Sequence, residues 1–181
     1  MDEIVKQALV KWPKVPDCYG WLGLDARGNW YLRDDSVQAL GPFCDPAAQS
    51  KGDRLEHVGL IEFIARNYEA DARGCWFFQN GPQRVYVELE RTPFVWRLES
   101  DGKVLSHNGR SAWVRSSVLD EQGRLYLQTD IGFGLVHSMD MGLAANAVEQ
   151  GVWLPLSLPS QSLPGRFCYV RSPQALQLKA S

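Results

Sequence analysis

The sequence lacks long hydrophobic runs and clusters of basic residues. No apolar stretch approaches the roughly 18 residues that a membrane-spanning helix needs, and residues 1–6, MDEIVK, have neither the basic start nor the apolar run of a secretory signal. The net charge is -2, with both signs mixed along the chain, so the electrostatic footprint of a protein that binds nucleic acid or anionic membranes is missing. We therefore expect a cytoplasmic protein with neither a nucleic-acid nor a membrane partner.

Motifs for catalysis and metal binding are also missing. The four cysteines are widely and irregularly spaced, with no Cys-x-x-Cys pair, which is typical of small apolar residues in a reducing compartment. The three histidines, His57, His107 and His137, have no partner at a metal-ligand spacing. No nucleophile elbow, phosphate loop or dinucleotide fingerprint occurs. We expect no catalytic residues, no metal and no cofactor.

The chain does contain enough apolar material for a folded core. Of its 181 residues, 45% are hydrophobic and 22% are charged, and this balance argues against a disordered chain. Residues 2–10 have an apolar face and acidic residues at their start, which predicts a short N-terminal helix. Asp53 and Glu56 have the spacing of a capping box, which predicts one main helix over about 54–68.

Most of the remaining chain predicts β-hairpins. Apolar runs flank turn residues at 25–28, 79–82, 101–102 and 120–123. Residues 33–53, rich in Gly, Pro, Asp and Ser, predict a loop. A last strand is expected at 167–170, and residues 174–181 are expected to fray. The predicted fold class is α+β, with antiparallel hairpins or meanders.

A short motif recurs along the chain. Leu24-Asp25-x-x-Gly28-x-Trp30-Tyr31-Leu32 returns as Leu119-Asp120-x-x-Gly123-x-Leu125-Tyr126-Leu127, and a looser copy spans 71–78. Asp-x-x-Gly is a common hairpin turn, so chance is one interpretation. The other is a duplicated strand-turn-strand unit that begins each half of the molecule. In both interpretations the motif is structural.

The stretch from Glu56 to Trp96 resembles a family of uncharacterised bacterial proteins, domain of unknown function 1285 (DUF1285). The matching segments are LIEFIAR at 60–66, RGCWFF at 73–78 and VYVELERTPFV at 85–95, with shorter matches at 25–32, 127–130 and 167–170. The long 33–53 segment and the high tryptophan content depart from this family and fit a sister family of unknown function with the same plan. The resemblance implies two small halves built on related meanders, a role in signalling or regulation, and no established catalytic residues. We expect an α+β half at 1–98 and a β-rich half at 99–181, or one continuous unit.

Seven tryptophans fall mostly on the expected strands. One interpretation is a small β-rich core, because each buried indole removes a large area from water. The alternative is an aromatic-lined groove for a small molecule or peptide, in which arginines contact an anion. The candidate ligand-binding residues are Arg66, Trp76, Arg84, Trp96, Arg97 and His137.

Three functions follow as hypotheses. The one we favour is a non-enzymatic regulatory or signalling module that binds a small molecule or a protein. The second is an enzyme with an unrecognised site, where His137 works with a distant carboxylate in a concave pocket. The third is a homodimer or larger assembly formed through exposed strand edges.

Overall fold

The computed structural model describes residues 2–45 and 49–180; residues 46–48, in the expected 33–53 loop, lie outside the described residues. The chain divides into two compact units. The first unit comprises Met1–Asp25, Asn29–Glu90 and Tyr169–Ser181, and the second comprises Ala26–Gly28 and Arg91–Cys168. The expected halves were 1–98 and 99–181, whereas the chain leaves the first unit after Glu90 and its tail returns to that unit.

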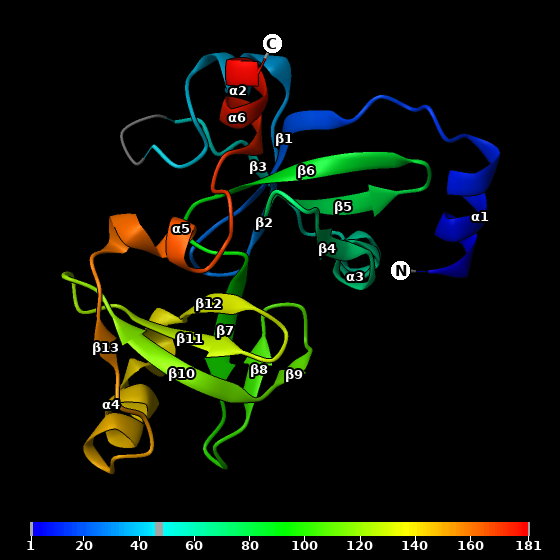
Figure 1. Cartoon of the computed structure of the whole chain (residues 1–181). Coiled ribbons are helices and arrows are strands. Elements are labelled where there is room, and N and C mark those ends of the chain that lie inside the picture. Colours follow the sequence, from blue (N-terminus) through cyan, green and yellow to red (C-terminus); the bar gives the residue numbers. More distant parts are fainter. Residues whose placement is uncertain (1, 46–48, 181) are drawn as a thin grey trace. The chain divides into compact units, whose positions relative to one another are not determined.

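The first unit is built on a sheet whose described strands lie in the order β3-β2-β1-β6-β5-β4 (Figure 1). The strands are β1 Cys18–Leu24, β2 Trp30–Leu32, β3 Asp53–Arg54, β4 Tyr68–Ala70, β5 Trp76–Asn80 and β6 Gln83–Leu89. The expected hairpins β1–β2 and β5–β6 are antiparallel. However, β1 and β6 run parallel, with Leu24 opposite Leu89. This central pair joins distant segments, and the hairpin pattern did not predict it.

The second unit is built on a sheet whose described strands lie in the order β13-β10-β11-β12-β7-β8-β9. The strands are β7 Phe94–Leu98, β8 Val104–Ser106, β9 Ser111–Ala112, β10 Val114–Leu119, β11 Leu125–Thr129, β12 Phe133–Val136 and β13 Leu156–Ser157. The expected hairpins β7–β8 and β10–β11 are antiparallel. The pairs β7–β12 and β10–β13 run parallel.

Six strands of the second sheet repeat the topology of the first sheet, and β13 is an additional strand at the edge of the second. When β1 is matched with β7, the order β3-β2-β1-β6-β5-β4 becomes β9-β8-β7-β12-β11-β10, with the parallel pair at the same place. The predicted α+β fold with two related halves is therefore confirmed. The equivalent copies of the sequence motif are those of Asp71, between β4 and β5, and Asp120, between β10 and β11, whereas Asp25 lies between β1 and β2.

The described residues contain more helices than the two expected. These are α1 Glu3–Lys11, α2 Asp35–Ala39, α3 Val58–Arg66, α4 Met141–Glu149, α5 Leu163–Arg166 and α6 Pro173–Ala180, with 3-10 helices η1 Ser138–Asp140 and η2 Ser160–Ser162. The N-terminal helix α1 is confirmed. The helix α2 lies inside the expected loop, where the Asp34 carboxylate accepts a hydrogen bond of 2.9 Å from the Val37 N–H and caps the first turn.

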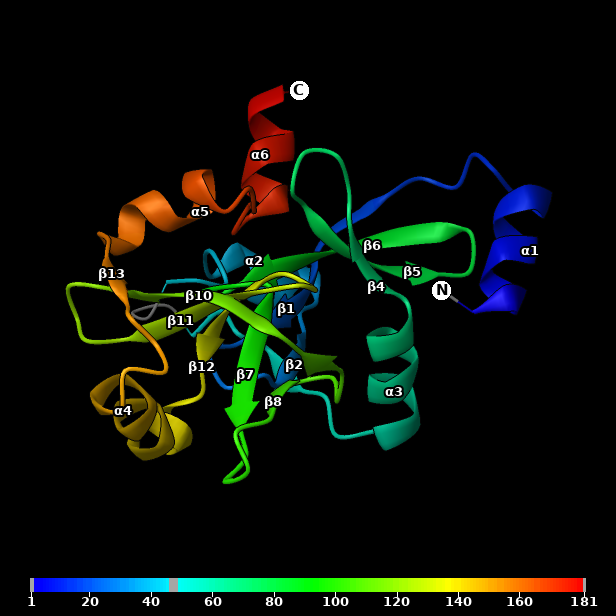
Figure 2. The same cartoon turned by 60° about the horizontal axis from the view of Figure 1, so that its bottom comes forward.

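The main helix begins later than predicted. Asp53 does not cap it, because Asp53 and Arg54 form β3 and pair with β2. His57 is the cap instead, and its Nδ1 accepts a hydrogen bond of 3.1 Å from the Leu60 N–H. Pairing along the sheet edge has thus overridden a local capping signal. The helix α3 packs against β5 (Figure 2).

The tail also differs from the prediction. The strand expected at 167–170 does not form, because Cys168 has a φ of +53°, which no strand residue adopts. Residues 174–180, which were expected to fray, belong to α6, which packs against β1 and β6. The Gln174 N–H at the start of α6 donates a hydrogen bond of 2.9 Å to the buried Glu88 carboxylate. The tail is therefore tied to the first unit.

Each unit has its own apolar core. Buried side chains of the first unit include Leu22, Leu24, Trp30, Tyr86 and Leu89, and those of the second include Phe94, Trp96, Leu125, Leu127 and Val136. Only some tryptophans serve as core residues, since Trp12, Trp21 and Trp113 are exposed. No helix among the described residues is long and apolar enough to span a bilayer.

Candidate functional site

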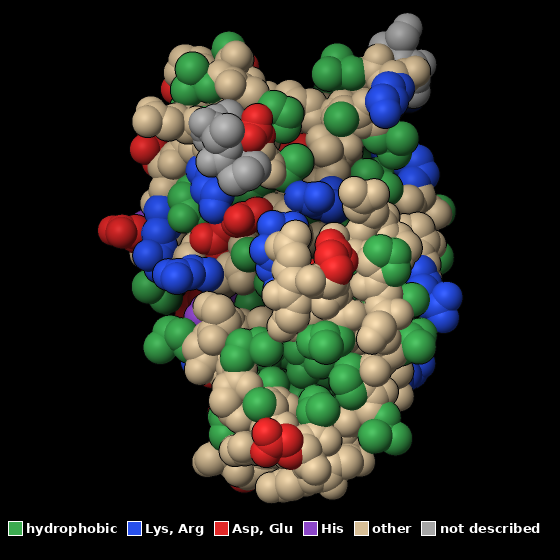
Figure 3. Space-filling view, turned by 90° about the vertical axis from the view of Figure 1, so that its left-hand side faces the viewer, with side chains coloured by type: hydrophobic (Ala, Val, Ile, Leu, Met, Phe, Trp, Pro, Cys, Tyr) green, Lys and Arg blue, Asp and Glu red, His purple; other side chains and the backbone are tan. Residues whose placement is uncertain are grey.

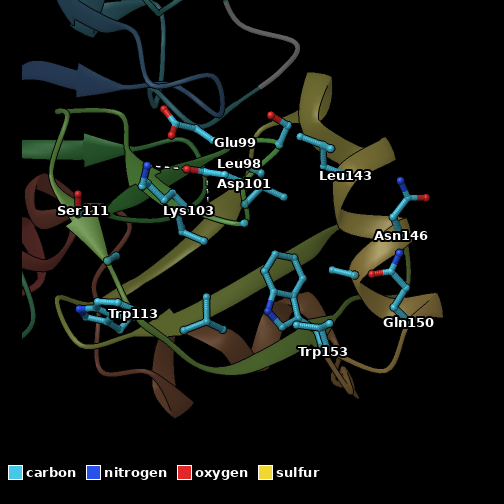
Figure 4. A pocket seen from close by; sticks show the side chains of 17 residues that line it. Leu98, Glu99, Asp101, Lys103, Ser111, Trp113, Leu143, Asn146, Gln150 and Trp153 are labelled. Atoms are coloured by element: carbon cyan, nitrogen blue, oxygen red, sulfur yellow. Dashed lines mark hydrogen bonds and ion pairs between the residues drawn. The ribbon is translucent and has the colours of Figure 1, made fainter.

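The second unit contains a cavity of about 670 Å³ (Figure 4). Its walls come from the β7–β8 turn, from β8 and β9, from the start of β10, from α4 and from the segment that follows α4. The floor is apolar and includes the buried side chains of Leu98, Val104 and Ala112. The rim carries polar side chains and two indoles. This volume falls within the range of sites that hold small molecules.

Trp113 stands at the rim, between β9 and β10. Its side chain is 79% exposed, yet its backbone is fixed on both sides. The Trp113 N–H donates to the Asp130 carboxylate at 2.8 Å, and the Trp113 carbonyl accepts from the Asp130 N–H at 3.1 Å. The local structure thus presents an exposed indole on a well-anchored backbone, which is a common feature of binding surfaces.

Trp153 reaches the cavity because of the way α4 ends. Gly151 has a φ of +71°, and its N–H donates to the Val148 carbonyl at 3.0 Å. The Val152 N–H donates to the Ala147 carbonyl at 2.9 Å, which completes a Schellman motif. The Trp153 N–H also donates to the Ala147 carbonyl, at 3.1 Å. These bonds fold the chain back on the helix and set Trp153 beside the cavity floor (Figure 4).

Charged side chains lie on the β7–β8 turn. The Glu99 N–H donates to the Lys103 carbonyl at 2.9 Å and so closes the turn. The Lys103 ammonium forms an ion pair of 2.5 Å with Asp101, and this contact lowers the pKa of Asp101 and raises that of Lys103. The two charges offset each other at the rim. Glu99 supplies a further carboxylate.

Two amides extend the rim along α4. Asn146 and Gln150 are four residues apart, so they lie one above the other on the same helix face. Both are exposed and both line the cavity, with Ala147 between them. Amides donate and accept hydrogen bonds, and neither carries a charge. The cavity therefore combines flat apolar surfaces with hydrogen-bonding groups at its edge.

The candidate residues of the second unit do not line this cavity. Trp96 is fully buried, and its Nε1–H donates to the Leu127 carbonyl at 3.0 Å. Arg97 donates to the buried Asp140 carboxylate at 2.7 Å. Burial by itself raises the pKa of Asp140. The bonds from Arg97 and from a backbone N–H outweigh this effect, so the pKa is lowered and the carboxylate stays ionised. His137 lies close to Asp140 and accepts a backbone N–H at the start of η1.

The candidate residues of the first unit lie apart from one another. Arg66 forms an exposed ion pair of 3.3 Å with Asp2. Trp76 packs on Tyr68, with ring centroids 4.7 Å apart. Neither lines the cavity of the second unit or the polar hollow of the first unit that Arg84 lines.

Arg84 lines a polar hollow of about 570 Å³ in the first unit. Its guanidinium lies 4.8 Å from the centre of the Phe77 ring. Arg73 lines the same hollow, but it pairs with Asp71 at 2.9 Å, so its charge is already matched within the chain. Acidic side chains also line this hollow, which therefore lacks the excess of positive charge that an anion site needs.

Sequence reasoning missed the residues that form the cavity. The candidate aromatic residues were Trp76 and Trp96, whereas Trp113 and Trp153 line the cavity. The sequence feature that could have indicated this cavity is the pair of amides Asn146 and Gln150, which are spaced by one helical turn. Among residues 2–45 and 49–180, no group of three or more His, Cys, Asp or Glu side chains is placed to hold a metal ion.

Two solved structures are similar to this chain. A DUF1285 family protein from Shewanella baltica OS155 is 15% identical, with a TM-score of 0.46, over 70% of this chain and 91% of that one. A DUF1285 family protein from Silicibacter pomeroyi DSS-3 is 12% identical, with a TM-score of 0.48, over 81% of this chain and 84% of that one. No curated protein matches the chain.

A family model matches residues 1–174, which is nearly the whole chain. The family is named DUF2944, and its printed description is "Protein of unknown function (DUF2946)". The sequence had indicated a DUF1285-like protein or a member of a sister family of unknown function, and the family model confirms that the chain belongs to a family of unknown function. The chain belongs to the DUF2944 family of proteins of unknown function.

Proposed function

We propose that this chain is a non-enzymatic binding module of the bacterial cytoplasm with a regulatory role, and that the cavity of the second unit is its binding site. The observation that supports this proposal is the cavity itself, with an apolar floor, two indoles and an amide-bearing helix at its rim. Sites for small molecules have this composition, with few polar groups on an apolar surface. Ligand occupancy would be the signal that the module passes on.

The geometry around His137 supports the enzyme hypothesis less well than the cavity supports the binding hypothesis. His137 lines neither the cavity of the second unit nor the polar hollow of the first, and it does not line a further cavity of about 230 Å³ beside β10, β11 and α4. Its neighbour Asp140 already binds Arg97 through both carboxylate oxygens, at 2.7 and 3.3 Å. A general base needs an open path to its substrate, so we favour binding over catalysis.

The test uses a cavity-filling variant and a matched control. Ala147 lines the cavity, whereas Ala145 lies on another face of α4, where it is exposed and lines a separate, smaller cavity of about 230 Å³. We expect a thermal-shift screen of metabolites to yield compounds that stabilise the wild type and Ala145→Phe but not Ala147→Phe. The proposal fails if no compound in the screen separates Ala147→Phe from the other two proteins.

An exposed apolar surface favours homodimerisation as a second candidate function. Leu154 and Leu156 are 83% and 52% exposed on and beside β13, a two-residue strand at the edge of the second sheet. Figure 3 shows hydrophobic side chains gathered on this face of the second unit. An edge strand can pair with the same strand of a second copy about a two-fold axis.

Light scattering at several concentrations tests the dimer. We expect the wild type to dimerise as concentration rises and Leu154→Lys to remain a monomer, because a charge at the edge opposes strand pairing. Leu178→Lys is the control, since Leu178 is 73% exposed but lies in the first unit. A wild type that stays monomeric at high concentration would exclude this function.

A further inference from the structure

We infer that the cavity of the second unit binds a neutral saccharide, and this inference rests on the proposed binding function. A sugar ring has two nearly apolar faces made of C–H groups and an edge that carries hydroxyls all round. The cavity has the complementary arrangement, with apolar surfaces at the centre and hydrogen-bonding side chains around them (Figure 4).

The two indoles supply surfaces for the faces of the ring. Trp113 leaves most of its side chain uncovered, which is costly for so large an apolar group unless a ligand covers it. The indole face is electron-rich, and so it attracts the weakly positive C–H groups of a sugar. Trp153 is half-buried and offers a second surface next to the floor.

The rim supplies partners for the hydroxyls. Seven polar side chains line the cavity, and they are Glu99, Ser100, Asp101, Lys103, Ser111, Asn146 and Gln150. Together they offer both donors and acceptors, as a hydroxyl requires. Asn146 and Gln150 are neighbours at one helical turn, about 5–6 Å apart at Cβ. This spacing is comparable with the width of one sugar ring, so both amides can reach hydroxyls of the same ring.

The charge of the rim selects among ligands. Two carboxylates and one ammonium leave one net negative charge, since Asp101 and Lys103 pair with each other. A negative rim disfavours phosphorylated sugars and other anions. A cationic ligand would need a carboxylate close to the indoles, but Figure 4 places Glu99 on the side of the cavity away from Trp113 and Trp153. A neutral ligand fits the remaining groups.

The site is also preorganised. The backbone of Trp113 is fixed by its two bonds to Asp130, and that of Trp153 by the Schellman motif that ends α4. These two backbone segments therefore need little ordering when a ligand arrives, which reduces the entropic penalty of binding. This property matters for sugars, because they must displace well-bound water before they form new hydrogen bonds.

The experiment titrates the full chain with glucose, galactose, maltose and cellobiose, followed by tryptophan fluorescence and by calorimetry. We expect at least one of these sugars to bind the wild type. Trp113→Ala should weaken that binding by about tenfold, since it removes a stacking surface. Trp12→Ala is the matched control, because Trp12 is also exposed but lies in the first unit, and it should bind like the wild type.

A second variant tests the rim. The double variant Asn146→Ala, Gln150→Ala should also weaken sugar binding, while alanine at exposed helix positions keeps α4 folded. The inference is overturned if compounds occupy the cavity, as judged by their loss in Ala147→Phe, and none is a neutral sugar. In that case the proposed binding function stands. If no compound loses its binding in Ala147→Phe, both the saccharide inference and the proposed binding function are wrong.

Discussion

Three aspartates, Asp25, Asp71 and Asp120, build the same turn at different places. Each carboxylate accepts the backbone N–H four residues later, from Asn29, Cys75 and Arg124, at 2.8–3.0 Å. Each also accepts a tyrosine hydroxyl, from Tyr31, Tyr86 and Tyr126. The turn is readable from the sequence, because Asp and Gly have fixed roles in it. The hydrogen bond between Tyr86 and Asp71 cannot be predicted in this way, because Tyr86 lies on the neighbouring strand β6 and not in the turn segment itself.

Removing one of these carboxylates should destabilise its unit. Asp120 is 5% exposed and accepts the Tyr126 hydroxyl at 2.8 Å. Asp120→Ala should lower the free energy of unfolding by about 1–3 kcal/mol, because the buried hydroxyl loses its partner. Denaturant unfolding measures this loss. Asp101→Ala is the control, since Asp101 caps an exposed turn, and we expect a change within about 0.5 kcal/mol. Equal effects would contradict the role of burial.

Glu88 should make stability depend on pH. Burial raises its pKa, and contacts with Ser172, Gln174 and Arg33 lower it only in part. With a raised pKa, the folded state holds a proton that the unfolded state releases, so stability falls as pH rises from the ordinary glutamate value through the raised one. Glu88→Gln lacks this titration and should gain stability relative to the wild type across that window.

Thermal melts at a series of pH values check this prediction, with Glu121→Gln as the control of opposite sign. Glu121 accepts the Ser160 hydroxyl at 2.6 Å and the Ser160 N–H at 2.7 Å, and these bonds lower its pKa. Its stabilising contribution is therefore present at neutral pH and lost as pH falls through the lowered value. Parallel pH curves for Glu88→Gln and the wild type would refute the account of Glu88.

At the scale of the element, the end of α4 decides how the cavity is formed. Gly151 adopts a φ of +71°, which an L side chain rarely adopts, and the Schellman bonds depend on it. Gly151→Ala should lower the stability of the second unit by about 1 kcal/mol. It should also move Trp153 and so change its fluorescence. Calorimetry and emission spectra measure the two effects.

Gly142 offers a control on the same helix. It lies within α4, its φ is not positive, and an added Cβ would meet nothing within 4 Å. Gly142→Ala should therefore be neutral or stabilising by up to about 1 kcal/mol. If both alanine variants behave alike, the backbone conformation at Gly151 is not what holds the helix end.

At the scale of the whole molecule, the chain builds one topology twice and returns its tail to the first unit. The Leu89 N–H donates to the Arg171 carbonyl at 2.8 Å, and the Val170 N–H donates to the Gly74 carbonyl at 2.9 Å. The tail thus pairs with two segments of the first unit, whereas residues 91–168 of the second unit are continuous in sequence.

Fragments should reproduce this division. We expect residues 91–168 to unfold cooperatively, because their sheet and core come from one continuous segment. Residues 1–90 alone should be less stable than residues 1–90 joined to 169–181 by a short Gly/Ser linker, because the linked form restores the bonds of the tail. Circular dichroism melts measure both. Equal melting of the two first-unit fragments would show that the tail contributes nothing.

The sequence by itself determined the local features of this protein. Turn residues and apolar alternation located the hairpins β1–β2, β5–β6, β7–β8 and β10–β11, and the helical face at residues 2–10 located α1. These features depend on neighbours in the chain, so local chemistry suffices to predict them. The family resemblance added the plan of two related halves.

Only the tertiary structure decided which distant segments meet. The parallel pairs β1–β6 and β7–β12, the conversion of Asp53 and Arg54 from helix cap to edge strand, and the docking of α6 on β1 and β6 all need partners far along the chain. The cavity has the same origin, since Trp113 and Trp153 approach it from different elements. Such contacts depend on register and packing, which a single sequence does not display because the residues involved carry no local sign of their partners.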